Sequence, residues 1–117
     1  MAEKSLEHLA ECLREFANER DWEQFHSPKN LAMALTVETA ELLEHFQWMT
    51  EEESAKPTLG KLQKIQEEIG DVLIYLTRFA DRLGIDTLDA AYKKLEINRV
   101  KYPIQKAKGS AKKYTDL

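Results

Sequence analysis

The chain has 117 residues, 43% of them hydrophobic, and a formal net charge of −4. That length supports one domain with a modest core, and no apolar run approaches the length of a membrane-spanning helix. A single cysteine, Cys12, excludes an intramolecular disulfide, and its apolar helical neighbours predict a packed thiol. The N-terminus lacks the pattern of a signal peptide, so we expect a soluble cytoplasmic protein without membrane contact.

Four main helices are predicted, with short connections between them. Ser5 can cap the first helix, which is expected to end near Arg20. Ser27 followed by Pro28 is a preferred helix start, and the second helix is expected to run to about Trp48.

A short extra turn is predicted after Thr50, where three glutamates follow, and Pro57 should end it. The third helix is expected over about 60–83, and Asp86 caps a fourth that Pro103 ends. The side of this fourth helix that is expected to be buried carries Leu88, Ala91, Leu95 and Val100. The predicted fold is an all-α, four-helix bundle-like single domain.

Two acidic pairs, Glu38-x-x-Glu41 and Glu68-x-x-Asp71, lie in the most apolar helical stretches of the chain. A spacing of three places both members of a pair on one side of a helix, one turn apart. Such pairs are more often a solvated face, but buried ionised carboxylates need a compensating cation or donor. Oxygen ligands from two helices suit a hard divalent cation, most simply Mg²⁺ or Mn²⁺.

The chain divides by composition into a helical region, 1–100, and a basic tail, 101–117, which we expect to pack near the active site. The tail is rich in lysine, although the chain as a whole is acidic, so nucleic-acid binding is not expected. A tail that closes over a small polyphosphate is the sharper hypothesis, and a solvated, frayed tail is the simpler one.

An ordered set of motifs resembles the all-α nucleoside triphosphate pyrophosphohydrolases, closest to the MazG-like dCTP pyrophosphatase type. Besides the two acidic pairs, the matching segments are Arg20-Asp-Trp-Glu-Gln-Phe-His26, Pro28-x-Asn30-Leu31, Phe46-Gln-Trp48, Asp71-Val-Leu-Ile-Tyr75, Ile97-Asn98-Arg99, Tyr102-Pro103 and Lys113-Tyr114. They cover the chain from about residue 13 to its C-terminus.

The resemblance implies hydrolysis of a deoxynucleoside triphosphate, with dCTP as the best candidate, to the monophosphate and pyrophosphate in nucleotide-pool housecleaning. It implies that Mg²⁺, or Mn²⁺ as a substitute, is held by the catalytic residues Glu38, Glu41, Glu68 and Asp71. It also implies a homo-oligomer, a tetramer made of two dimers, whose active sites share residues between subunits.

The same resemblance implies three groups of substrate-binding residues. Aromatic positions around the nucleotide are Trp22, His26, Trp48 and Tyr75; a polar stripe comprises Lys94, Asn98, Arg99 and Tyr102; and the tail adds Lys113 and Tyr114. Leu13 stands where the vertebrate dCTP enzymes of this family carry a histidine near the base, which leaves the preferred base open.

Other functions compete with this hypothesis. A di-iron carboxylate bundle requires Glu-x-x-His on two helices, and the one such spacing, Glu23 to His26, has no second copy. A non-catalytic oligomeric helical interaction protein would use the same helices as an interface. Within the hydrolase hypothesis, the general base is one of the four acidic residues or Glu44.

Overall fold

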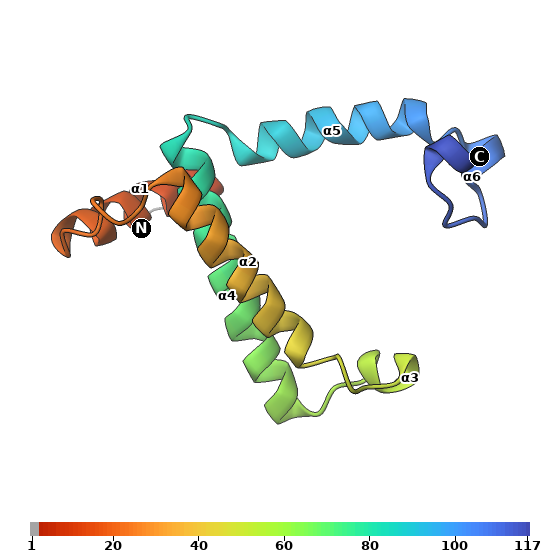
Figure 1. Ribbon diagram of the computed structural model, residues 1–117, viewed down its shortest axis with the longest axis horizontal. Coiled ribbons are helices and arrows are strands. Elements are labelled where there is room, and N and C mark those ends of the chain that lie inside the picture. Colours follow the sequence, from red (N-terminus) through yellow and green to blue (C-terminus); the bar gives the residue numbers. More distant parts are fainter. Residues whose placement is uncertain (1–2) are drawn as a thin grey trace. The chain divides into compact units, whose positions relative to one another are not determined.

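The computed structural model describes residues 3–117, and all of their regular structure is helical (Figure 1). The elements are α1 (Leu6–Glu19), α2 (Pro28–Glu44), α3 (Glu51–Ser54), α4 (Leu59–Arg82), α5 (Thr87–Lys101), α6 (Ile104–Ala107) and a 3-10 turn, η1 (Tyr114–Asp116). No strand occurs between residues 3 and 117. The all-α class predicted from the sequence is confirmed.

A polar side chain caps the start of each longer helix, as the sequence predicts for Ser5, Ser27 and Asp86. Ser5, Ser27, Thr58 and Asp86 each accept a hydrogen bond from a backbone N–H in the first turn of α1, α2, α4 and α5. Thr50 and Glu53 form a reciprocal capping box on α3. These bonds satisfy backbone donors that a helix leaves without a partner, so local sequence alone places the helix starts.

The chain divides into two compact units, one that reaches to Ile85 and one from Asp86 to Leu117. In the first unit, α2 and α4 run side by side in opposite directions, and α1 packs on α4 (Figure 1). The buried apolar residues there are Ala17, Leu31, Ile65 and Ala80. The antiparallel α2–α4 pair is therefore the frame of this unit.

The second unit contains α5, α6 and η1. Its last residues fold back on the end of α5, where the rings of Tyr102 and Tyr114 meet edge to face with centroids 5.9 Å apart. Lys101 Nζ lies 4.7 Å from the centroid of the Tyr114 ring, a cation–π contact. The tail is thus anchored locally by aromatic contacts.

Three predictions from the sequence are wrong in the single chain. The helix α2 ends at Glu44 rather than near Trp48, because residues 45–49 continue as turns closed by short-range backbone bonds. Cys12 is an exposed free thiol rather than a packed one. The helix α5 contains no buried residue, and Val100 is 80% exposed. Apolar periodicity predicts a helix face that is suited to burial, but no other described part of the single chain covers that face of α5.

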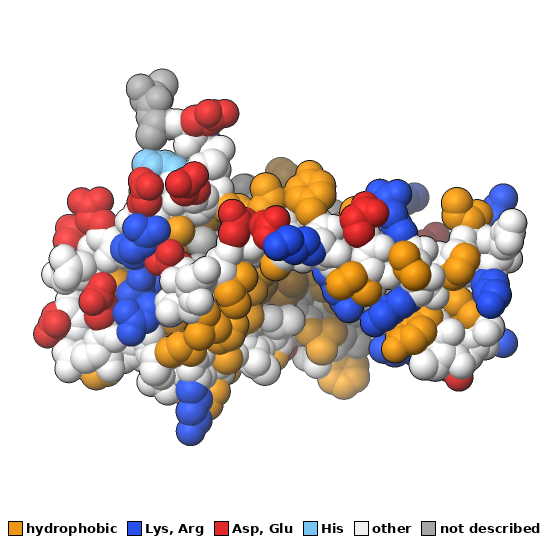
Figure 2. All heavy atoms as spheres, turned by 90° about the horizontal axis from the view of Figure 1, so that it is seen from above, with side chains coloured by type: hydrophobic (Ala, Val, Ile, Leu, Met, Phe, Trp, Pro, Cys, Tyr) orange, Lys and Arg blue, Asp and Glu red, His pale blue; other side chains and the backbone are white. Residues whose placement is uncertain are grey.

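Many further apolar side chains of the first unit are open to solvent, among them Met33, Val37 and Leu43 of α2. Figure 2 shows such side chains lying among charged ones on the drawn face. The apolar character that α2 carries almost all round is therefore only partly buried within the chain. Among residues 3–117, no helix combines the length and apolar character that a membrane crossing requires.

Replacing Ser27 with alanine should lower the free energy of unfolding by about 1 kcal/mol, since the Ser27 hydroxyl accepts the Asn30 backbone N–H at 3.1 Å. Urea unfolding followed by circular dichroism at fixed protein concentration measures the loss. Ser27→Asp retains an acceptor and should unfold close to wild type. Equal stability of Ser27→Ala and wild type would contradict the role of this cap.

Candidate functional site

Three of the predicted metal ligands converge between α2 and α4. Glu38, Glu41 and Glu68 each contribute a carboxylate oxygen, and these oxygens lie within 4.8 Å of one another. Glu38 and Glu41 stand one turn apart on α2, and the neighbouring helix α4 brings Glu68 to them. We call these three residues the acidic cluster.

Without a bound cation, the crowding of carboxylates in the acidic cluster is electrostatically unfavourable. Glu38 Oε2 and Glu68 Oε2 are shielded from solvent and have no hydrogen-bond partner among the described residues. The pKa of Glu38 is raised from its ordinary value of 4.5 to about 7, first by burial, then by Glu41, and then by the charges of Asp71 and Glu68. Carboxylate oxygens that are buried, unpaired and crowded together could bind a metal cation.

Asp71, the fourth predicted ligand, follows Glu68 by one turn of α4 and lies outside the group of three. Its charge nevertheless contributes to the raised pKa of Glu38. Asp71 also lines the neighbouring pocket. It therefore borders on both the acidic cluster and the pocket.

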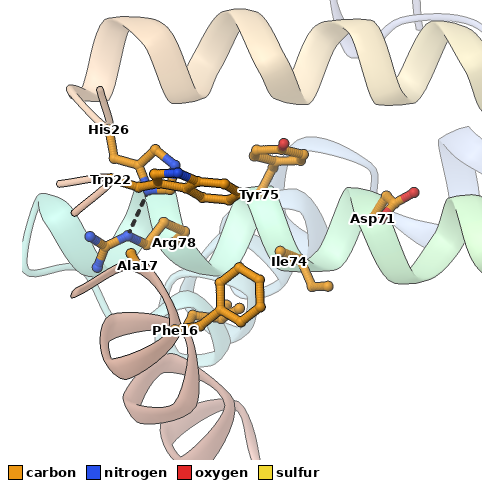
Figure 3. A pocket seen from close by; sticks show the side chains of 9 residues that line it. Phe16, Ala17, Trp22, His26, Asp71, Ile74, Tyr75 and Arg78 are labelled. Atoms are coloured by element: carbon orange, nitrogen blue, oxygen red, sulfur yellow. Dashed lines mark hydrogen bonds between the residues drawn. The ribbon is translucent and has the colours of Figure 1, made fainter. Parts of the chain in front are cut away.

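A pocket with a volume of about 330 Å³ lies against the same stretch of α4 (Figure 3). Its lining comes from α1, from the connection between α1 and α2, and from α4: Leu13, Phe16, Ala17, Trp22, His26, Asp71, Ile74, Tyr75 and Arg78. Three predicted aromatic residues, Trp22, His26 and Tyr75, thus meet at one cavity. Trp22 is held edge-on between Phe16 and His26, with ring centroids 5.7 and 6.0 Å away.

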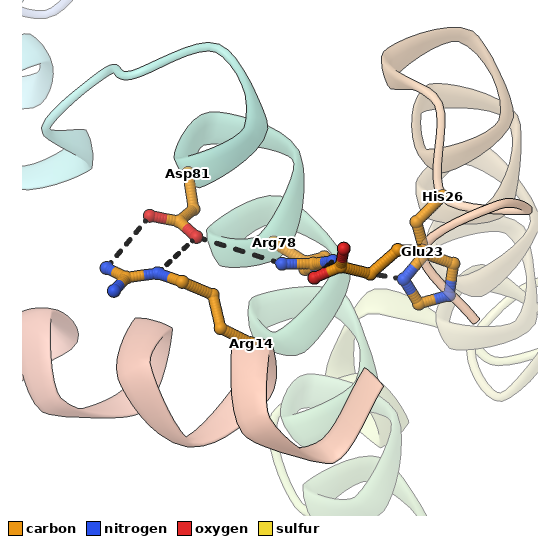
Figure 4. A network of polar contacts seen from close by, with 5 residues as sticks. All are labelled: Arg14, Glu23, His26, Arg78 and Asp81. Atoms are coloured by element: carbon orange, nitrogen blue, oxygen red, sulfur yellow. Dashed lines mark hydrogen bonds and ion pairs between the residues drawn. The ribbon is translucent and has the colours of Figure 1, made fainter. Parts of the chain in front are cut away.

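Two residues of the pocket lining, His26 and Arg78, belong to a network of polar contacts (Figure 4). Arg78 Nε donates to His26 Nδ1 at 3.3 Å, and the same guanidinium lies 3.8 Å from a carboxylate oxygen of Glu23 and of Asp81. Arg14 of α1 binds Asp81 through two hydrogen bonds, 2.8 and 3.2 Å long. The network ties α1 and the connection after it to α4.

The remaining predicted site residues are Trp48 and those of the second unit. Trp48 follows α2, is 89% exposed and does not line the pocket. The polar stripe and tail residues belong to the second unit: Lys94, Asn98, Arg99, Tyr102, Lys113 and Tyr114. In that unit Arg99 Nε pairs with Glu96 at 3.1 Å.

Arg78, the most buried charged residue of the first unit, was not predicted from the sequence, and neither were the pocket walls Phe16 and Ile74. Helical spacing could have found Arg78, because Asp71, Tyr75 and Arg78 recur at four and seven residues and so share one face of α4. The signal in the sequence is therefore a charged residue, Arg78, on the helix face that also carries Asp71 and Tyr75.

Replacing Glu38 with glutamine should stabilise the metal-free chain at pH 8 by on the order of 1 kcal/mol. Between about pH 4.5 and 7 the folded Glu38 carboxyl holds a proton that the unfolded one has released, so wild-type stability falls as the pH rises through that window. Glutamine carries no charge to repel its neighbours, and the difference should shrink at pH 5.

Urea unfolding in chelator-treated buffer at both pH values measures this effect. Glu67→Gln, which removes an exposed charge next to Glu68, is the matched control and should show no such gain. A Glu38→Gln variant that is less stable than wild type at pH 8 would contradict the electrostatic account.

Comparison with known proteins shows to which family the chain belongs. The chain is 45% identical to dCTP pyrophosphatase 1 of Bos taurus, over 99% of this chain and 70% of the bovine protein. It is equally identical to dCTP pyrophosphatase 1 of Homo sapiens, over 98% of this chain and 69% of the human protein.

Among solved structures, a pyrophosphatase from Archaeoglobus fulgidus matches with a TM-score of 0.80 and 40% sequence identity, covering 88% of this chain and 96% of that one. The model of the MazG-like family matches residues 33–117, which include both acidic pairs. On this evidence the chain belongs to the MazG-like family.

Proposed function

We propose that the chain is a Mg²⁺-dependent pyrophosphohydrolase that converts a deoxynucleoside triphosphate to the monophosphate and pyrophosphate, with dCTP as the first candidate. The observation that carries the proposal is the acidic cluster beside a mainly apolar pocket, with Asp71 bordering on both. The similarity to dCTP pyrophosphatase 1 supports the choice of substrate. Nucleotide-pool housecleaning in the cytoplasm is the role that we infer from this activity.

The four acidic residues are the proposed Mg²⁺ ligands: Glu38, Glu41, Glu68 and Asp71. Mn²⁺ is the natural substitute, since both are hard cations that prefer oxygen ligands. The bound cation would offset negative charge on the triphosphate and on the leaving pyrophosphate. The two unpaired buried oxygens of Glu38 and Glu68 support this assignment, because a cation would remove their desolvation cost.

The proposed reaction forms a bond from a water oxygen to the α-phosphorus and breaks the bond from that phosphorus to the oxygen bridging to the β-phosphate. The water must lose a proton, and one of the four acidic residues or Glu44 can accept it. The electrons of the broken bond stay on the pyrophosphate oxygen. The chain's task is to hold the triphosphate and the water in line.

The pocket supplies the proposed site for the base. Trp22 and Tyr75 offer aromatic surfaces, and stacking of a base on such a side chain contributes about 1–3 kcal/mol. Apolar walls at Leu13 and Ile74 favour a flat base that is poor in charge. The stripe and tail residues of the second unit are the proposed donors to sugar and phosphates: Lys94, Asn98, Arg99, Tyr102, Lys113 and Tyr114.

The exposed apolar surface supports assembly into a homo-oligomer, for which we propose a tetramer built from two dimers. Trp48 is 89% exposed and Leu43 is 62% exposed, and both lie near the C-terminal end of α2. Large apolar side chains gathered on a surface mark interaction sites. A tryptophan in that position fits the expectation that one subunit completes the site of another.

Incubation of the purified protein with Mg²⁺ and a panel of nucleoside triphosphates should yield monophosphate and pyrophosphate, with no product in EDTA. The panel contains dCTP, 5-methyl-dCTP, dUTP, dTTP, dATP and the ribonucleotides. Glu38→Gln and Glu68→Gln should each reduce kcat at least about 100-fold and should abolish the rise in melting temperature that Mg²⁺ produces in wild type.

Glu67→Gln serves again as the control and should keep both the activity and the Mg²⁺-dependent stabilisation. Full turnover in Glu38→Gln or Glu68→Gln would contradict the proposed site. If no nucleotide is cleaved with Mg²⁺ or Mn²⁺, the alternative of a non-catalytic oligomeric interaction protein, favoured by the same exposed apolar surface, would take its place.

Sedimentation of wild type should give a mass that is a multiple of the 13.6 kDa chain. Replacing Leu43 with lysine should shift the assembly toward smaller species, since a charge would be placed on an exposed apolar face of α2. Lys64→Leu and wild type should sediment alike, because Lys64 is exposed on α4 and lies outside the apolar face of α2. A 13.6 kDa species across micromolar concentrations would contradict assembly.

A further inference from the structure

Arg78 is a charged side chain placed inside the first unit, with 3% of the residue exposed. Burying a guanidinium is costly unless its N–H groups are used, so its contacts indicate what it does there. Its Nε donates to His26 Nδ1, its Nη1 lies 3.8 Å from Asp81, and its Nη2 lies 3.8 Å from Glu23 (Figure 4). Nη2 is buried and makes no hydrogen bond within residues 3–117.

The bond from Arg78 determines which nitrogen of His26 carries a proton. An arginine Nε always bears hydrogen and can act only as a donor. His26 Nδ1 must therefore accept, and in the neutral ring the proton then resides on Nε2. Nε2 makes no hydrogen bond with any residue from 3 to 117, and His26 lines the pocket, as Figure 3 shows.

The surroundings also keep the ring of His26 neutral. The charged groups that act on it are Arg78 and Arg82 from α4 and Glu23 from its own connection. Burial lowers the pKa of His26, and the two arginines lower it further, whereas Glu23 opposes them. A second proton on Nδ1 would also face the Arg78 N–H directly.

We propose that Arg78 is a positioning residue that holds His26 as the neutral Nε2–H tautomer and so makes it a fixed hydrogen-bond donor in the pocket. This donor would bind a ligand that presents a hydrogen-bond acceptor to it, either a ring nitrogen or a carbonyl oxygen. The identification of that ligand as a nucleotide base rests on the proposed function. Glu23 and Asp81, the latter held by Arg14, set the guanidinium in place.

The tautomer can be measured without any substrate. Long-range ¹H–¹⁵N spectra of the metal-free wild-type protein at pH 7 should show His26 with a protonated Nε2 and an unprotonated Nδ1. His26→Gln identifies the resonances among the three histidines. An Nδ1–H tautomer, a mixture or a doubly protonated ring would overturn the proposal.

Two variants separate the hydrogen bond from the charge. Arg78→Lys keeps the charge but loses the Nε–H, and Arg78→Met loses both. Each should produce mixed tautomers at His26 and raise KM for the best nucleotide about tenfold, with kcat changed less than about threefold. Arg82→Gln, which removes an exposed cation one turn further along α4, should leave the tautomer unchanged.

A purely structural role for Arg78 would give a different result: kcat and melting temperature would fall while the His26 tautomer persisted, and that result would overturn the proposal. If both Arg78 variants fail to fold, the wild-type spectrum together with Glu23→Gln, which loosens the guanidinium but keeps Arg78, decides it. If no nucleotide is hydrolysed, the proposed function fails, and the wild-type tautomer still decides the claim about Arg78.

Discussion

The packing of α2 along α4 is the constraint on which the rest of the candidate site depends. Apolar residues such as Leu31 and Ile65 draw the two helices together, and the carboxylates beside them have to follow. Glu38 and Glu68 thereby lose solvent around one oxygen each without gaining a donor. The free energy of apolar burial thus maintains an electrostatically unfavourable cluster, and a cation would convert that cost into binding affinity.

The buried arginine of the neighbouring pocket, Arg78, differs from the acidic cluster because groups of opposite charge lie close to it. Arg78 is buried in the company of Glu23, Asp81 and His26, so its charge is compensated within the chain. These contacts join α1 and the connection after it to α4, and Arg78 and His26 are also part of the pocket wall. In the acidic cluster, by contrast, one oxygen each of Glu38 and Glu68 has no hydrogen-bond partner among the described residues, and the basic side chain paired with the cluster there is His45, 3.9 Å from Glu68. This contrast agrees with a metal at the first and an organic group at the pocket.

The surface explains where expectations from hydrophobic pattern were wrong. One face of helix α5, with Leu88, Ala91, Leu95 and Val100, and the Cys12 thiol were expected to be buried, yet the single chain leaves them exposed. Hydrophobic periodicity shows that a helix face is suited to burial, but it carries no information on whether the covering surface belongs to the same chain. The exposed apolar residues of α2 follow the same pattern: they are suited to burial, and the described part of the chain does not cover them.

The sequence by itself determined where the helices begin and which acidic residues share a helix face. Caps at Ser5, Ser27, Thr50 and Asp86 begin helices through bonds within one turn, so neighbouring residues suffice to predict them. Spacing likewise predicted which carboxylates share a helix face. Only the tertiary structure decided that Glu68 meets Glu38 and Glu41, that Asp71 borders on the pocket, and that Arg78 donates a hydrogen bond to His26. These are contacts between residues far apart in the chain, and they depend on how the helices pack rather than on any local pattern.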